Sequence, residues 1–510
     1  MKHDLVLILD FGGQYTQLIA RRIRECNVYC QIKPFDININ EILQLKPKAI
    51  VLSGGPSDVN NDYGYQLDKD FWNKVNVPVL GICYGMQLMV KNNGGMVTNN
   101  HSTEFGKVDI CLNNQIDLFC DIKPNQKCWM SHNDSVANTN NKFKVIASTS
   151  NCKFAAVKHI DKKWYGVQFH PEVTHTPFGK QMISNFLFLI SDINPTWESK
   201  SIIEEQILKI KETIKDKKAI CALSGGVDSL VAATLVSKAI GDNLLCVFVD
   251  HGLLRKNEKQ EVFNMVNKIG LNVKFVNAEQ LFLNQLKNIK EPEQKRKIIG
   301  NLFIKVFEKI KNELDESYQF LVQGTIYPDI VESGNKTNKT IKSHHNVGGL
   351  PKDMKFQLVE PLKELFKDEV RNVGVALNLP KENVYRQPFP GPGLGVRVIG
   401  EITKEKLDIL KEADYIFRTK LLQSCTRLPW QYFAVILDSK SVGVVGDNRA
   451  YGYTICLRAV DTEDAMSCEW TKIDLNLLAE ISSLITNTIP KVNRVVYDIT
   501  NKPPGTIEWE

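Results

Sequence analysis

The sequence predicts an α/β protein: two open, mostly parallel α/β domains followed by a small α+β C-terminal domain. Three observations support this prediction. Short apolar runs alternate with helical patterns over residues 1–190, the alternation restarts at Lys218, and a Pro/Gly cluster at 386–395 precedes a strand-rich segment. Because 510 residues exceed what one core accommodates, we expect domains at 1–193, 194–387 and 388–510.

Composition is that of an ordinary globular protein, with 43% hydrophobic and 24% charged residues. The net charge of +6 comes from 64 basic and 58 acidic residues that are interleaved along the chain. No block of like charge indicates a nucleic-acid or membrane surface, and no apolar run is long enough for a signal peptide or a membrane span. We therefore expect a cytoplasmic protein without nucleic-acid or membrane partners.

The 12 cysteines are scattered without a CxxC pair, and several lie inside apolar runs. This distribution favours reduced core cysteines over disulfides or a zinc site.

In the first domain, the runs Leu5–Leu9, Ala49–Leu52 and Val77–Ile82 are typical of buried parallel strands. Each ends in Gly or Asp, and ligands of open α/β sheets gather at this carboxyl edge. Residues 192–197 break the alternation and resemble a linker.

Cys83 follows the third of these strands in a glycine-flanked turn, Gly81 to Gly85, and a helix begins just after it. The positive end of that helix would lower the thiol pKa, and the glycines would permit a tight turn like the nucleophile elbow of hydrolases. The Tyr84 amide would point into this site, and the glycine-rich turn at 53–56 offers further N–H donors.

His170 is the candidate base for this thiol. In an extended segment, residues two apart point the same way, so Glu172 would hold the imidazole tautomer while His170 faces the sulfur.

With these residues, positions 1–190 resemble a class I glutamine amidotransferase domain. The resemblance implies a Cys83–His170–Glu172 triad, with the Gly55 and Tyr84 amides as oxyanion hole. It also implies hydrolysis of glutamine through a glutamyl thioester. His132 lies in Ser-His-Asn-Asp, where Asn133 replaces the family's usual glycine; we expect His132 to be structural or to support the site from behind.

A second site follows the strand at 219–223, where Ser-Gly-Gly-Val-Asp-Ser precedes an apolar helix. A glycine loop at a helix N-terminus binds phosphate, and the GK[ST] ending of a Walker A loop is absent. The segment resembles the pyrophosphate loop of ATP pyrophosphatases. By that resemblance the ATP-binding residues are Ser224, Gly225, Gly226, Val227, Asp228 and Ser229, with Val249 near the adenine. Asp228 would bind Mg²⁺ or brace the loop; Mg²⁺ is expected with ATP, and no tightly bound organic cofactor is expected.

The C-terminal third indicates the nitrogen acceptor. The runs at 388–394, 493–498 and 502–510 resemble those of glutamine-hydrolysing GMP synthases, in collinear order with the other two domains. This resemblance implies that glutamine, ATP and XMP are the substrates and that the chain forms a homodimer through its last domain. XMP-binding or lid residues would be Arg296, Asp329, Lys342, Lys502, Ile507 and Glu508. Gln387 stands where the family carries His before the Pro-rich run.

Two alternatives remain open at this point. One keeps both sites but sends the nitrogen to another adenylated acceptor, such as a nicotinate dinucleotide or a tRNA base. The other is a nucleotide-sensing regulator with a vestigial thiol site. A tRNA substrate would call for a basic, aromatic surface, which the sequence does not indicate.

Overall fold

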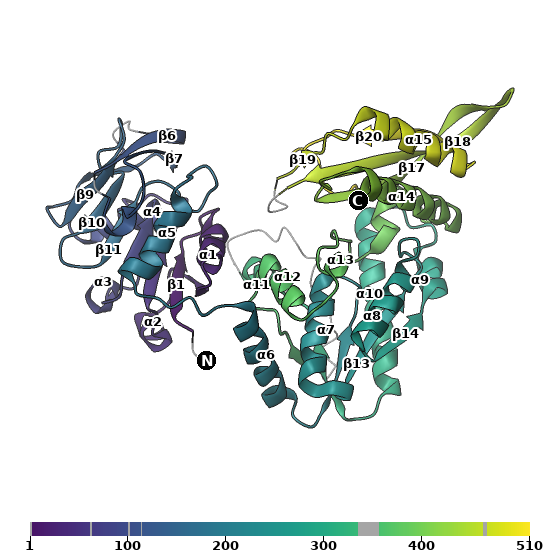
Figure 1. The fold of residues 1–510 in the computed structure, drawn as a ribbon, viewed down its shortest axis with the longest axis horizontal. Helices are drawn as coiled ribbons and strands as arrows, with labels where there is room; N and C mark the ends of the chain where they lie inside the picture. Colours follow the sequence, from purple (N-terminus) through teal and green to yellow (C-terminus); the bar gives the residue numbers. More distant parts are fainter. Residues whose placement is uncertain (1–2, 62–63, 100–102, 114, 335–355, 463–466) are drawn as a thin grey trace. The chain divides into compact units, whose positions relative to one another are not determined.

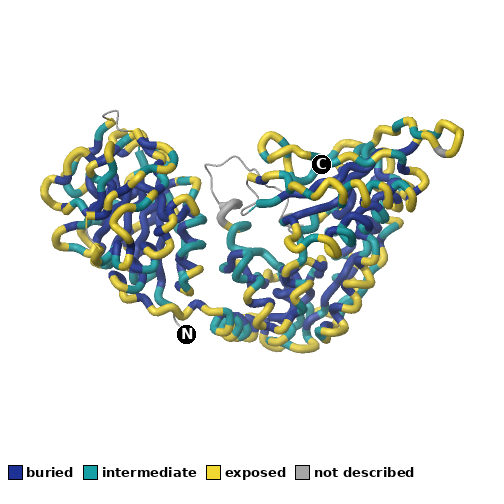
Figure 2. The backbone as a smooth tube through the Cα atoms, turned by 45° about the horizontal axis from the view of Figure 1, so that its top comes forward, coloured by how far each residue is buried: buried dark blue, intermediate teal, exposed yellow. Residues whose placement is uncertain are grey.

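A computed structural model describes residues 3–61, 64–99, 103–113, 115–334, 356–462 and 467–510. The chain divides into two compact units, Met1–Ile202 and Ile203–Glu510. Figure 2 shows that buried residues are concentrated in the interior of each unit and that exposed residues lie at its periphery. Within the described residues, no helix combines the length and apolar character that a membrane span needs.

The first unit is built on a nine-stranded sheet in the order β2-β1-β3-β4-β11-β10-β9-β6-β7 (Figure 1). Its parallel half contains the three predicted apolar runs as β1 (Leu5–Asp10), β3 (Ala49–Leu52) and β4 (Val79–Ile82). Two further parallel strands that were not predicted, β2 (Tyr29–Pro34) and β11 (Trp164–Val167), belong to the same half. The other half is antiparallel, which the sequence analysis did not anticipate: β10 (Ala156–His159), β9 (Phe143–Ser148), β6 (Glu104–Leu112) and β7 (Asn125–His132). The sheet is therefore mixed.

Five α-helices accompany this sheet in the first unit: α1 (Thr16–Arg24), α2 (Ile39–Leu45), α3 (Phe71–Lys74), α4 (Tyr84–Asn92) and α5 (Gly179–Asn185). A π-helical turn at Phe186–Ile190, a 3-10 turn at Asp117–Phe119 and the small sheet of β5 (Met96–Thr98) with β8 (Ser135–Asn138) complete it. Residues 192–198, which include the predicted linker at 192–197, form neither helix nor strand.

The second unit begins with a five-stranded, fully parallel sheet. In order across the sheet the strands are β14 (Val273–Asn277), β13 (Leu244–Asp250), β12 (Lys218–Ala222), β15 (Tyr318–Val322) and β16 (Gln357–Val359). The helices of this region are α7 (Val227–Ile240), α8 (Glu258–Ile269), α9 (Glu279–Leu286), α10 (Pro292–Glu313), α11 (Tyr327–Gly334), α12 (Lys367–Ala376) and α13 (Lys381–Val384). Helix α6 (Ser199–Ile214) leads into the unit from the end of the first.

The last region holds a four-stranded sheet of β17 (Gln431–Val445), β18 (Asn448–Asp461), β19 (Glu469–Trp470) and β20 (Val492–Asp498), with helices α14 (Lys404–Ser424) and α15 (Leu475–Thr488). β17 is one long strand, because its pairing with β18 continues across a register shift between Ile436 and Lys440. The core of this region is continuous with that of the five-stranded sheet, since one cluster of buried side chains includes Ile220 and Val247 as well as Phe417 and Leu457.

Candidate functional site

Cys83 lies in a tight turn between β4 and α4. Its backbone has φ 48° and ψ −105°, which is unusual for a residue with a side chain, and its N–H donates to Val167 O at 2.8 Å. A Cβ on Gly81 would lie 2.7 Å from the carbonyl carbon of Gly85, and one on Gly85 would lie 2.5 Å from Leu52 O. Glycines are required here because the turn brings α4 against β3 and β4, as the sequence analysis expected for an elbow.

His170 and Glu172 follow β11 and are buried. His170 Nδ1 lies 2.7 Å from Glu172 Oε1. Burial alone would lower the pKa of His170; the charge of Glu172 and the neighbouring Cys83 outweigh it and raise the pKa to about 10. The structure thus brings together the three residues of the predicted triad.

The triad backbone is anchored at two points. Arg22 Nε donates to the carbonyl of Glu172 at 2.9 Å, and Thr176 Oγ1 donates to the carbonyl of His170 at 2.7 Å. The Tyr15 ring meets the imidazole edge-on at 5.1 Å between centroids. These contacts restrict the movement of His170 relative to the sulfur.

The two predicted oxyanion donors come from different segments: Gly55 lies in the loop after β3, and Tyr84 begins α4. Among the described residues, the backbone N–H groups of Gly55 and Tyr84 have no hydrogen-bond partner. A Cβ on the neighbouring Gly54 would lie 3.3 Å from His170 Cε1 and 3.8 Å from Cys83 Cβ, so the glycine turn faces the triad. Unpartnered N–H groups at such a place suit a developing oxyanion.

Two buried glutamines that were not predicted from the sequence contact each other, and one of them contacts the sulfur of Cys83. Gln168 is fully buried, and its Nε2 donates to Cys83 Sγ at 3.5 Å. Gln87 Nε2 contacts Gln168 Oε1 at 3.3 Å and donates to Asp134 O at 2.7 Å. The signal was present, because Gln168 precedes His170 by two positions and so shares its face in an extended segment.

Asn133, which replaces the family's usual glycine, does not adopt a left-handed backbone conformation. Its φ is absent from the positive-φ residues of the described chain, and the turn from β7 to β8 forms without it.

The phosphate loop connects β12 to α7, as predicted. Ser229 Oγ lies 3.0 Å from Ser224 Oγ and donates to Gly226 O at 3.1 Å, while the Gly226 N–H donates to Ser224 Oγ at 3.3 Å. Gly225 has φ +76°, which favours glycine. A Cβ on Gly324, at the end of β15, would lie 3.0 Å from the backbone of Asp228 and Ser229, so this neighbouring segment packs directly on the loop.

Two cations that the sequence analysis did not single out hold this loop. Lys367 Nζ donates to both carboxylate oxygens of Asp228, at 2.8 and 2.6 Å, and Arg386 Nη1 donates to Gly225 O at 3.2 Å. Arg386 also pairs with Glu258 at 2.6 Å, a buried carboxylate. With both oxygens engaged by an ammonium group, Asp228 fits the bracing role better than the metal-ligand role. Val249, near the predicted adenine site, is buried at the end of β13.

The C-terminal tail is tied to the second unit by ion pairs. Arg397, which is buried, donates to both oxygens of Glu508, at 3.0 and 2.8 Å, and Gln431 Nε2 donates to Glu508 Oε1 at 2.8 Å. Arg296 donates to the main-chain oxygen of Glu510. These pairings bring Arg296 and Arg397 to the tail, 214 and 111 residues from their respective partners Glu510 and Glu508.

The other residues predicted to bind XMP or to belong to a lid lie in different structural environments. Ile507 packs against the buried cluster of Phe433, Val435 and Cys456, and the backbone of Lys502 bridges to Cys468. Asp329 Oδ2 accepts from Ile326 N–H at 3.0 Å at the start of α11. Lys342 and the paired histidines at 344–345 lie outside the described residues.

Gln387 has a local role in the structure. Its Oε1 accepts from the Tyr432 N–H at 2.8 Å, which fastens the Pro-rich run to the start of β17.

Fold and sites together define a class I glutamine amidotransferase joined to an ATP pyrophosphatase in one chain. Family models match in the same order: Glutamine amidotransferase class-I over 7–190, NAD synthase over 200–409 and GMP synthase C terminal domain over 422–509. The GMP synthase (glutamine-hydrolyzing) of Malacoplasma penetrans is 58% identical over 512 residues, covering 99% of this chain and 100% of the relative. The enzymes of that name from Clostridium tetani and Clostridium kluyveri are each 54% identical, with 100% of both chains covered. The chain belongs to the family of glutamine-hydrolysing GMP synthases.

Proposed function

We propose that this chain hydrolyses glutamine to glutamate and ammonia, adenylates XMP with ATP, and aminates the adenylated intermediate to give GMP and AMP. The observation that carries the proposal is the pairing of an assembled Cys–His–Glu site in one unit with a pyrophosphate-type loop in the other. The full-length similarity to GMP synthases favours XMP over the other adenylated acceptors, although an NAD synthase model matches the central region.

In the glutaminase half, Cys83 Sγ attacks the side-chain amide carbon of glutamine. The N–H groups of Gly55 and Tyr84 stabilise the oxyanion of the tetrahedral intermediate. His170 carries the proton and gives it to the departing nitrogen, which leaves as ammonia while the thioester forms. Water, deprotonated by His170, then attacks the thioester and releases glutamate and the Cys83 thiol. Glu172 keeps the imidazole oriented and stabilises its charge.

In the second half, the loop from Ser224 to Ser229 binds the pyrophosphate that leaves when the C2 oxygen of XMP attacks the α-phosphate of ATP. Its free N–H groups sit at the N-terminus of α7, where an anion is stabilised. Mg²⁺ would be bound with ATP and would supply positive charge that offsets the phosphates. Val249 would border the adenine, and Asp228 braces the loop through Lys367.

XMP would contact Arg296, Lys502, Ile507 and Glu508, with Asp329 and Lys342 near the reacting groups. Cations suit a phosphate, and a carboxylate suits purine N–H groups. In the structure Arg397 engages Glu508, so XMP binding would have to share or replace part of that pairing.

Three wider features complete the proposal. We assign the glutaminase to 1–193, the pyrophosphatase to 194–387 and the acceptor-binding region to 388–510. We also assign the last region to homodimer contacts and the enzyme to the cytoplasm.

The decisive experiment measures XMP-dependent release of AMP and pyrophosphate with glutamine or ammonium chloride as nitrogen donor. Wild type should work with both donors, and Cys83→Ala should work with ammonium while losing at least about a thousandfold with glutamine. The exposed Cys111→Ser is the matched control and should behave as wild type. Absence of XMP-dependent AMP with either donor in wild type would reject XMP as the acceptor.

A further inference from the structure

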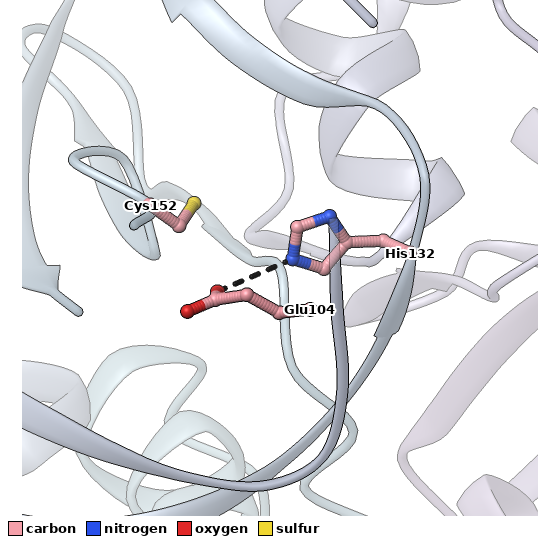
Figure 3. A group of neighbouring side chains, drawn as sticks. All are labelled: Glu104, His132 and Cys152. Atoms are coloured by element: carbon pink, nitrogen blue, oxygen red, sulfur yellow. Dashed lines mark ion pairs between the residues drawn. The ribbon is translucent and has the colours of Figure 1, made fainter. Parts of the chain in front are cut away.

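Three buried side chains of different chemistry meet beside the glutaminase site (Figure 3). Glu104 begins β6 and is the cross-strand partner of His132, which ends β7. Cys152 comes from the loop between β9 and β10. One carboxylate oxygen, one ring nitrogen and the sulfur all lie within 4.8 Å of one another, and each residue is at most 5% exposed.

Three polar atoms of this cluster have no hydrogen-bond partner in the described protein. Glu104 Oε2 and both ring nitrogens of His132 are buried without a hydrogen-bond partner. His132 Nε2 and Glu104 Oε2 lie 3.4 Å apart, beyond the usual range of an N–H···O bond. Leaving a buried carboxylate oxygen and imidazole unpaired is costly, so the cluster calls for an additional partner.

The separation matches what a tetrahedral metal ion imposes. A nitrogen and an oxygen that each bind Zn²⁺ at about 2.0–2.2 Å are held roughly 3.3–3.5 Å apart. The sulfur would then lie about 3.6 Å from each, so it needs to move by little more than about 1 Å.

The cluster also has the outer support that metal ligands require. Glu104 Oε1, the oxygen not facing His132, accepts from Thr149 Oγ1 at 2.7 Å. The same hydroxyl accepts from the Cys152 N–H at 2.8 Å. Thr149 therefore orients two of the three ligands from behind.

We propose that Glu104, His132 and Cys152 form a buried site for a divalent transition metal ion, with Zn²⁺ the best match. A nitrogen, sulfur and oxygen donor set suits Zn²⁺ and disfavours Mg²⁺ and Ca²⁺, which take oxygen ligands. A water molecule would fill the fourth position. The cysteine spacing gave no hint of zinc because the ligands come from three separate segments.

Such an ion would be structural and would act close to the nucleophile. It would join β6, β7 and the loop at 149–152, and Ser131, adjacent to His132, places its carbonyl 3.8 Å from Cys83 Sγ. The ion would thereby fix the end of β7 against the catalytic turn.

The test uses the full chain, loaded with Zn²⁺, freed of loose metal by gel filtration, and analysed by inductively coupled plasma mass spectrometry. Wild type should retain about one zinc per chain. Cys152→Ser and His132→Gln should each retain at least tenfold less, while Cys30→Ser, a buried cysteine of the same unit outside the cluster, should match wild type. Co²⁺-loaded wild type should show thiolate-to-cobalt charge-transfer absorption that Cys152→Ser lacks.

Two results would overturn the site. One is wild type that retains less than a tenth of a zinc per chain, in which case ordered water is the partner of these groups. The other is equal zinc in wild type, Cys152→Ser and Cys30→Ser, which would place the metal elsewhere. Because Ser replaces Cys152 with little change of volume, this arm remains informative even if His132→Gln does not fold.

Discussion

At the residue scale, the proposed glutaminase site depends on groups that do not themselves react. Cys83 occupies a strained backbone conformation, and its sulfur accepts a hydrogen bond from Gln168. A hydrogen bond donated to a thiolate is charge-assisted and stabilises that form more than the neutral thiol.

Replacement of Gln168 tests this contact. Gln168→Leu removes the donor to Cys83 Sγ with little change of volume, and a hydrogen bond to a charged group contributes about 1.5–3 kcal/mol. We expect kcat for glutamine hydrolysis to fall roughly ten- to hundredfold. Ammonium-dependent synthesis should be unchanged, as should both activities in Gln181→Leu, which alters an exposed glutamine of the same unit. Equal loss of both activities in Gln168→Leu would indicate general unfolding instead.

The pKa of His170 predicts a pH-dependent stability. Because the folded pKa lies near 10, above the ordinary 6.5, protonated His170 stabilises the fold fully below pH 6.5, and this stabilisation is lost as pH rises through about 10. Glu172→Gln removes the charge that raises this pKa. The variant should be less stable than wild type by about 3 kcal/mol at pH 7, and by clearly less at pH 9.5.

Urea unfolding at the two pH values, followed by alkylation of the buried Cys30 and Cys128, measures the stability of the first unit. Glu41→Gln, an exposed carboxylate in the same unit, should show no difference from wild type at either pH. A deficit in Glu172→Gln that does not change with pH would contradict the role of the His170 charge.

At the scale of elements, each site is a strand-to-helix turn that needs close backbone packing. Gly85 provides this for α4, since a Cβ there would lie 2.5 Å from Leu52 O and 2.8 Å from Leu52 C. Both atoms belong to the backbone of β3, so neither moves without displacing the strand.

Gly85→Ala should therefore push α4 away from β3. We expect a loss of about 1–3 kcal/mol of stability in the first unit and a large loss of glutamine-dependent activity, with ammonium-dependent activity retained. Gly300→Ala gives the contrast, because Gly300 is exposed within α10 and a Cβ there meets nothing within 4 Å. That change should stabilise the protein by about 0.5–1 kcal/mol, as measured by urea unfolding. A Gly85→Ala protein with wild-type glutaminase activity would refute the packing argument.

The sequence predicted the parts of each site that are contiguous in the chain, but not the parts that come from distant segments. The elbow and the phosphate loop were predictable because strand, turn and helix are contiguous in each, and so was the relation between His170 and Glu172. The partners of the second loop were not, because Lys367 and Arg386 lie 139 and 161 residues from Asp228 and Gly225. The antiparallel half of the first sheet was missed because the residue types of a strand such as β6 do not follow its alternation of exposed and buried positions: Glu104 is buried, whereas Phe105 is exposed.

At the scale of the whole molecule, each catalytic centre is built within one unit. The proposed glutaminase residues all lie before Ile202, and the proposed phosphate loop and the C-terminal tail lie after Ile203. This separation explains why changes at Cys83, Gln168 or Gly85 should spare ammonium-dependent synthesis. The C-terminal sheet instead shares its core with the pyrophosphatase sheet, so damage to either should affect the other.

The β17–β18 hairpin carries the last prediction, because it exposes apolar side chains that a second copy of the chain would cover. Val442 and Tyr451 are cross-strand partners that are 48% and 72% exposed, and Val444, two positions along the same face, is 77% exposed. Val444→Lys combined with Tyr451→Lys should convert a dimer to a monomer, halving the mass measured by light scattering, with glutaminase activity intact. Leu208→Lys with Leu428→Lys, exposed apolar residues outside the hairpin, should leave the mass unchanged. Dissociation is expected because lysines that face each other across a two-fold interface repel. A hairpin variant that remains dimeric would place the contact surface elsewhere. A monomeric wild type would show that no such contact forms.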